Sequence, residues 1–183
     1  MMSRIVLLLM VATLVGACAT EKKSDAPPEA VLLFKKDGIR IDVKAAPDLN
    51  TYNDQAHTLV VVVFQLEDPN KFNQILQDKD GVGKLFDPAS LEGSALGRKQ
   101  LVVQPGDETK VYLDRAKGAR YLGFVAGYYK NDSKNSGRLL PLKLIRDTSF
   151  IAPKGQPDPA ESQVNLSLGR EGITDSITIL ERK

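Results

Sequence analysis

The sequence predicts a mainly all-β domain, an antiparallel β-sandwich with a small helical insertion. Apolar and polar residues alternate in short segments, as in 39–44. Turn residues such as those at 105–107 separate these segments. One stretch, 70–77, has the spacing of a helix instead. Short alternating strands joined by turns are typical of two packed sheets.

The first strands are expected on either side of a turn at Asp37-Gly38. The segment 31–34 is apolar, and an Asp-Gly pair between two such runs is a strong hairpin signal. The segment 39–44 alternates strictly, so every second side chain should face a core. The core side chains would be Ile39, Ile41 and Val43, with Arg40, Asp42 and Lys44 in water.

The segment 57–66 is a nearly continuous apolar run, which favours a central strand covered on both faces. Asp68-Pro69 then ends the strand. Phe72, Ile75 and Leu76 follow at i, i+3 and i+4, which predicts a short helix over 70–77. Leu85 and Phe86 extend this apolar patch. We therefore expect a partly helical insertion over 69–96.

Further short segments predict the remaining strands. In the segment 121–129, Gly123, Ala126 and Gly127 would let another element approach closely. Pro141 predicts that the segment 138–145 is bulged or lies at a sheet edge. A hairpin loop is expected at 131–137 and a Pro-rich connection at 152–161. The expected strands are 100–103, 109–113, 121–129, 138–145, 164–168 and 177–180.

The N-terminus predicts export. Arg4 precedes the apolar run 5–15, which is too short to span a bilayer and is typical of a cleaved signal peptide, here residues 1–17. The run ends in Gly16-Ala17-Cys18, and Cys18 is the only cysteine. Small residues before a cysteine resemble the lipobox of bacterial lipoproteins, which implies a covalent lipid on Cys18. The alternative is an ordinary signal peptide with a chance cysteine.

Residues 18–30 are interpreted as the lipidated cysteine and a flexible tether, because this segment is polar and contains prolines. Two or three acyl chains would anchor firmly, since each buried CH₂ contributes about 0.8 kcal/mol. Ala19 follows the cysteine where the lipoprotein pattern uses Asp for inner-membrane retention. We therefore expect the periplasmic face of the outer membrane, with residues 31–183 forming the sandwich domain.

Composition indicates a binding or structural protein. The chain has 25 Lys and Arg against 23 Asp and Glu, and this balance argues against a nucleic-acid partner. His57 is the only histidine, so we expect no catalytic residues, no metal and no cofactor besides the lipid. The segment 78–81 lacks the ligands of a calcium loop and is interpreted as a turn. Asp114-Arg115 is expected to end a strand as a solvated pair.

Short motifs recur in a fixed order after the lipobox. They occupy residues 38–41, 46–50, 52–54, 57–59, 64–66, 68–73, 80–81, 86–88, 103–106, 114–116 and 125–129. In order and spacing they resemble the TssJ-type outer-membrane lipoproteins of type VI secretion systems. The resemblance covers about residues 31–145, and the tail from Arg146 onward is not matched.

The resemblance implies a transthyretin-like sandwich that tethers a trans-envelope complex to the outer membrane. The implied partner is the periplasmic C-terminal domain of TssM, with oligomerisation inside the membrane complex and a monomeric free domain. The family's partner-binding loop lies between its first two sandwich strands. Here that loop is Ala46, Pro47, Asp48, Leu49, Asn50, Thr51, Tyr52, Asn53, Asp54, Gln55 and Ala56.

The residues of this loop support two interpretations. Leu49 and Tyr52 are apolar side chains in a polar segment, so they are candidate anchors for a partner or plugs that fold onto the core. Asn50 and Asn53 suit either contact or turn positions with positive φ.

Two other functions remain open at this point. A carbohydrate- or ligand-binding sandwich would present an aromatic groove from Tyr121, Tyr128 and Tyr129, although strand spacing puts Tyr121 and Tyr129 on one face with at least one in the core. A transthyretin-like hydrolase would need several converging basic and His residues, and His57 alone makes it the weaker alternative.

Overall fold

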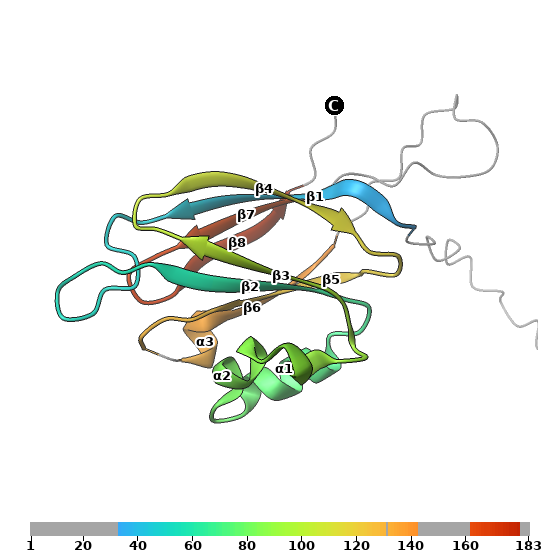
Figure 1. Ribbon diagram of the computed structural model, residues 1–183, viewed down its shortest axis with the longest axis horizontal. Helices are drawn as coiled ribbons and strands as arrows, with labels where there is room; N and C mark the ends of the chain where they lie inside the picture. Colours follow the sequence, from blue (N-terminus) through green and yellow to red (C-terminus); the bar gives the residue numbers. More distant parts are fainter. Residues whose placement is uncertain (1–32, 131, 143–161, 180–183) are drawn as a thin grey trace, which may run out of the picture. The chain divides into compact units, whose positions relative to one another are not determined.

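The computed structural model describes residues 33–130, 132–142 and 162–179. Two four-stranded sheets make up the sandwich (Figure 1). The first has the order β4-β1-β7-β8 and the second the order β3-β2-β5-β6. The predicted signal peptide, Cys18, the tether and the connection 152–161 lie outside the described residues. The strands are β1 (Lys35–Ala45), β2 (Leu59–Leu66), β3 (Ala95–Val103), β4 (Glu108–Arg115), β5 (Tyr121–Ala126), β6 (Gly137–Pro141), β7 (Ser162–Leu168) and β8 (Ile173–Ile179).

The second strand is covered on both faces, as its apolar run predicts. Alternate side chains of β2 point to opposite sides of the sheet. Leu59, Val61 and Val63 belong to the core between the two sheets. Val62, Phe64 and Leu66 belong to a second core beneath the helices. One strand thus joins two apolar layers, which explains the absence of polar alternation along it.

The helical insertion covers the outer face of the second sheet (Figure 1). It comprises α1 (Asn70–Gln77), α2 (Gly81–Phe86) and the 3₁₀ helix η1 (Pro88–Leu91). The predicted bounds of the first helix are confirmed. The Phe72 ring packs edge-on against Phe64, with centroids 6.1 Å apart. It also lies over Gly123 of β5, where a Cβ atom would come within 2.7 Å of the ring. The predicted close approach at Gly123 is therefore confirmed.

The hairpin predicted at Asp37-Gly38 is wrong. Both residues lie inside β1, where the pairing with β4 shifts register between Lys35 and Ile39. Asp37 has a φ of 51°, and its N–H donates to Asp114 Oδ1 at 2.8 Å. Positive φ is used by some β-bulges as well as by hairpin turns, so an Asp-Gly pair does not distinguish the two.

The sheets are not wholly antiparallel, which corrects a second expectation. β1 runs antiparallel to β4 but parallel to β7. Parallel neighbours need a long connection. β1 and β7 are separated by residues 46–161, a connection that includes all of the other sheet.

Arg115 corrects the expectation of a solvated pair. Asp114 is exposed, but Arg115 is fully buried, because it shares the inward face of β4 with Leu113. Its Nη2 donates to the carbonyl of Leu33 at 3.4 Å, and desolvation lowers its pKa.

The remaining differences concern element ends. The predicted strand 121–129 stops at Ala126, so Tyr121 and Tyr129 do not share a strand face. The expected hairpin loop at 131–137 contains α3 (Ser133–Ser136). β6 lies at a sheet edge, as Pro141 predicts, but it ends at Pro141, whereas the predicted strand ran to residue 145.

Candidate protein-binding site

The loop 46–56 leads from β1 in one sheet to β2 in the other. It lies at the end of the sandwich where β1 finishes (Figure 1). The β3–β4 and β7–β8 turns meet it there. The Ala45 N–H donates to the Asp107 carbonyl and the Ala46 N–H to the Leu168 carbonyl, both at 2.8 Å. We call this group of loops, residues 46–58, 104–107, 127–130 and 169–172, the loop end.

Asn50 ties three of these segments together. It is buried, with a φ of 46°, a conformation that Asn adopts more readily than most residues. Its Oδ1 accepts from the Tyr129 N–H at 2.8 Å, and its Nδ2 donates to the Thr58 carbonyl at 3.4 Å. The following N–H, of Thr51, donates to the Arg170 carbonyl at 3.1 Å. The turn interpretation of Asn50 is thus confirmed.

The tip of the loop is a tight turn. Tyr52 and Gln55 exchange backbone hydrogen bonds of 2.9 and 3.0 Å across Asn53 and Asp54. These two central residues have φ values of 48° and 58°. Positive φ at both central positions is the mark of a type I′ turn, which favours Asn and Asp. The tip is therefore held by its own backbone.

Leu49 is not an exposed anchor, and that interpretation is corrected here. Its side chain is fully buried in the core between the sheets. The His57 N–H closes the loop over it by donating to the Leu49 carbonyl at 3.0 Å. Leu49 is therefore a plug that folds onto the core, which was the alternative interpretation of this loop.

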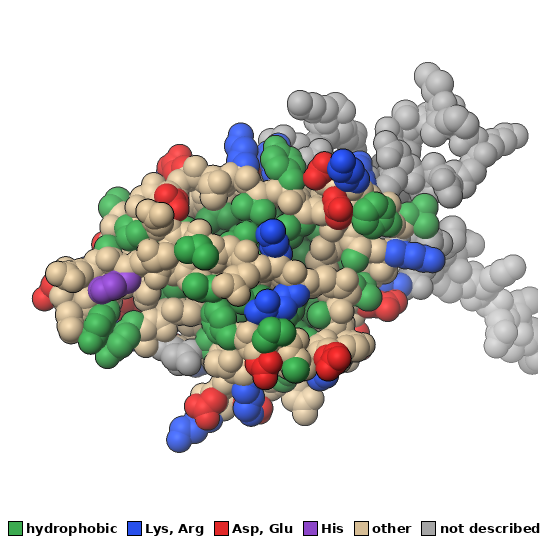
Figure 2. Space-filling view, in the orientation of Figure 1, with side chains coloured by type: hydrophobic (Ala, Val, Ile, Leu, Met, Phe, Trp, Pro, Cys, Tyr) green, Lys and Arg blue, Asp and Glu red, His purple; other side chains and the backbone are tan. Residues whose placement is uncertain are grey.

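Tyr52 faces solvent and is paired with another exposed aromatic residue, Tyr129. Their rings stack with centroids 3.9 Å apart and an interplanar angle of 29°. Tyr52 is 36% exposed and Tyr129 is 64% exposed. The His57 ring lies 5.7 Å from Tyr52. Figure 2 shows the histidine (purple) beside hydrophobic side chains (green) at this end of the domain.

Sequence reasoning did not join Tyr129 to this site. The apolar run 121–129 suggested one continuous strand, but β5 ends at Ala126. After that point Tyr128 turns inward and is buried, whereas Tyr129 turns outward. The signal that could have separated them is Gly127, whose missing side chain leaves room for the Phe86 ring.

The rim of the aromatic pair carries both signs of charge in ion pairs. Arg170 Nη1 lies 3.8 Å from Asp48 Oδ2, which links the loop to the β7–β8 turn. Lys130 Nζ lies 2.7 Å from Glu171 Oε1, and this contact lowers the pKa of Glu171. Exposed pairs contribute little stability. They match four of the charges at the loop end, while Asp54 and Asp107 add two further carboxylates to it.

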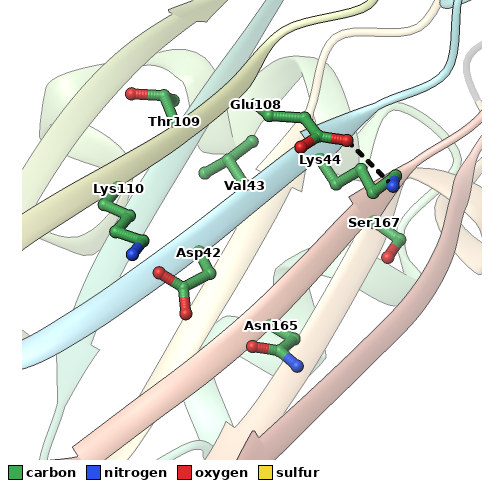
Figure 3. A pocket seen from close by; sticks show the side chains of 8 residues that line it. All are labelled: Asp42, Val43, Lys44, Glu108, Thr109, Lys110, Asn165 and Ser167. Atoms are coloured by element: carbon green, nitrogen blue, oxygen red, sulfur yellow. Dashed lines mark ion pairs between the residues drawn. The ribbon is translucent and has the colours of Figure 1, made fainter.

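A shallow polar pocket of about 380 Å³ lies on the outer face of the first sheet (Figure 3). Lys44 and Glu108 form an ion pair of 2.9 Å at one side, and Lys110 points toward Asp42 at the other. None of the eight lining residues is aromatic. Small-molecule sites are usually lined by apolar and aromatic groups, so this pocket gives the ligand-binding alternative little support.

The described residues also bear on whether the domain holds a metal ion or crosses a membrane. Within 33–130, 132–142 and 162–179, no three His, Cys, Asp or Glu side chains cluster closely enough to hold a metal ion. Among the same residues, no helix has both the length and the apolar character needed to cross a bilayer.

The fold defines a class of protein, a two-sheet β-sandwich with two exposed, stacked tyrosines at one end. The sequence of residues 37–171 matches the profile of the T6SS-SciN family, described as the type VI secretion lipoproteins VasD, EvfM and TssJ. The chain belongs to this family of type VI secretion lipoproteins, of the TssJ type. It is a family of structural, membrane-associated secretion components and not a known enzyme family.

Solved structures show the same fold. The lipoprotein TssJ1 from Pseudomonas aeruginosa is 21% identical, with a TM-score of 0.58 over 79% of this chain and 97% of that one. Lip from Serratia marcescens, a membrane-bound component of its type VI system, is 22% identical, with a TM-score of 0.59 over 76% and 96%. A chain of the EAEC structure described as the TssM C-terminal domain is 19% identical, with a TM-score of 0.51 over 77% and 98%. No curated protein matches the chain.

Proposed function

We propose that this protein is the outer-membrane lipoprotein of a type VI secretion trans-envelope complex. A lipid on Cys18 anchors it on the periplasmic side, and its loop end binds the periplasmic C-terminal domain of TssM. Family membership supports the secretion role. The likeness to chains of structures described as a type VI membrane complex and as the TssM C-terminal domain supports a place in that complex, and the choice of TssM follows from the family resemblance. Within the membrane complex the protein is present in several copies, and the free domain is a monomer.

The observation that carries this proposal is the position of the aromatic pair. β1 begins at Lys35, after Cys18 in the sequence, and ends at Ala45. The loop 46–56 follows directly. A strand of this length spans about 35 Å. The first strand of the domain therefore begins at one end of the sandwich, while Tyr52 and Tyr129 lie at the other. Such an arrangement leaves the aromatic surface free to meet a partner from the inner membrane.

A binding measurement tests the proposal. The lipidated protein in detergent is titrated with the purified TssM periplasmic domain, and Tyr52→Ala is compared with wild type. Truncating a central aromatic contact costs about 2 kcal/mol, or about thirtyfold in affinity. Tyr112→Ala is the matched control, because Tyr112 is also an exposed tyrosine but lies in the middle of β4.

The control variant should bind as wild type does. Replacing only the exposed tip, residues 52–55, by a Gly/Ser turn should abolish binding and leaves the buried Leu49 and the hydrogen bonds of Asn50 in place. Unchanged affinity in that variant would assign the site elsewhere and would leave the lipoprotein role untouched.

A further inference from the structure

We propose that Tyr129, outside the loop 46–56, is a contact residue of the partner surface. Tyr52 and Tyr129 together form one aromatic platform that receives an apolar side chain of the TssM periplasmic domain. This inference rests on the proposed function and extends its site to a segment that follows β5. The experiments below distinguish a failure of the Tyr129 platform from a failure of the proposed function.

The surroundings of Tyr129 hold its backbone and leave its ring free. Its N–H donates to Asn50 Oδ1 at 2.8 Å, and the preceding residue, Tyr128, is buried in the core. The ring itself is 64% exposed, more than that of any other tyrosine among the described residues. An exposed aromatic side chain on a fixed backbone, next to a second one, is a feature of protein contact sites.

The two rings are arranged before any partner binds. They stack at 3.9 Å, and Asn50 links the backbones of the segments that carry them. Rigid aromatic residues give a large contact area for a small loss of conformational entropy. Loss of either ring should therefore remove more than its own contacts, because the remaining ring loses the neighbour that positions it.

The charges around the platform indicate the chemistry of the partner surface. Asp48 is paired with Arg170 and Glu171 with Lys130, and Asp54 and Asp107 leave the loop end with a small surplus of negative charge. A partner recognised through the platform needs an aliphatic or proline side chain at its centre and at most a weakly basic rim. Affinity should thus change little with ionic strength, unlike that of an electrostatically steered pair.

The test measures affinity for the TssM periplasmic domain with full-length lipidated variants. Tyr129→Ala should weaken binding at least tenfold, with a melting temperature lowered by only the few degrees that the lost ring stacking accounts for, whereas Tyr129→Phe, which keeps the ring, should bind as wild type does. The double variant with Tyr52→Ala should lose less than the product of the two single losses, because the rings act together. Raising NaCl from 50 to 500 mM should change the wild-type affinity less than threefold.

A photo-crosslinking experiment keeps the inference testable if Tyr129→Ala does not fold. p-Benzoylphenylalanine at position 129 retains an aromatic ring and should crosslink to TssM in cells, whereas the same group at position 112 should not. Wild-type affinity in Tyr129→Ala, or equal crosslinking at 112, would overturn the platform. If replacement of the loop tip 52–55 still abolished binding, the proposed function would stand without the platform. Absence of binding by wild type would refute the proposed function itself, and a crosslink to a second copy would assign the platform to self-association.

Discussion

Leu49 and Tyr52 lie in the same loop but have opposite roles. Leu49 is fully buried between the sheets, whereas Tyr52 stacks on Tyr129 at the surface. The hydrogen bonds of Asn50, which lies between them, set this difference, because they fix the loop against β5 and the β7–β8 turn. Composition alone does not separate two apolar side chains in a polar loop. Only the path of the backbone does.

Leu49→Ala should destabilise the domain by about 3 kcal/mol, because truncating a buried leucine leaves a cavity. Urea denaturation of wild type and variant measures the loss. Tyr52→Ala is the control in the same loop. Apart from the lost stacking on Tyr129, it should lower the free energy of unfolding by less than about 1 kcal/mol. Equal stability of Leu49→Ala and wild type would show that the plug assignment is wrong.

Tyr128 should make the domain sensitive to alkaline pH. Burial raises the pKa of its phenol well above the ordinary value of 10.0. Above pH 10 the unfolded chain releases this proton and the folded domain keeps it, so stability falls as pH rises, by up to about 1.4 kcal/mol per pH unit. Below pH 10 the phenol is neutral in both states and the effect vanishes.

Tyr128→Phe isolates this contribution, because phenylalanine keeps the ring and cannot ionise. Denaturation curves at pH 9, 10 and 11 should show wild type losing more stability than the variant, while the lysines affect both equally. Parallel pH dependences would mean that the phenol ionises as freely in the folded domain as in the unfolded chain.

At the scale of elements, the contact between α1 and β5 depends on a missing side chain. Phe72 fills the space that a Cβ on Gly123 would occupy. Gly123→Ala should therefore destabilise the domain by about 1–3 kcal/mol, since the buried ring must move. Gly83→Ala is the matched control, because nothing lies within 4 Å of its Cβ position in α2 and alanine favours a helix. A thermal melt compares the two, and an undisturbed Gly123→Ala melt would contradict the packing.

The sequence predicted those elements whose pattern is local. The helix 70–77, the doubly covered strand β2 and the edge position of β6 follow from spacing and from one proline. The parallel pairing of β1 with β7 could not be predicted, because it depends on where the chain returns after a long connection. Tyr129 was missed for a related reason. Its partner, Tyr52, lies far away in the sequence, and no periodicity links two loops.

At the scale of the whole molecule, the described domain has a core between its sheets and a second core under its helices. The chain has a single cysteine, so no disulfide can form within it. We expect the thermal melt of the purified protein to be unchanged by EDTA and by reductant. A melting temperature several degrees lower in EDTA would reveal a metal site, with Asp78 to Gly81 and His57 as the first residues to test.

The central claim is that one molecule joins the outer membrane to TssM, through Cys18 at one end and the loop end at the other. Co-fractionation tests it most directly, with the TssM periplasmic domain expressed as a soluble protein in the periplasm. The account predicts that this domain sediments with outer membranes when the wild-type lipoprotein is present. It should remain soluble with Cys18→Ser or with the exposed loop tip 52–55 replaced by a Gly/Ser turn, which leaves the buried Leu49 in place. A TssM domain that stays soluble with wild type, or that sediments equally with either variant, would contradict the claim.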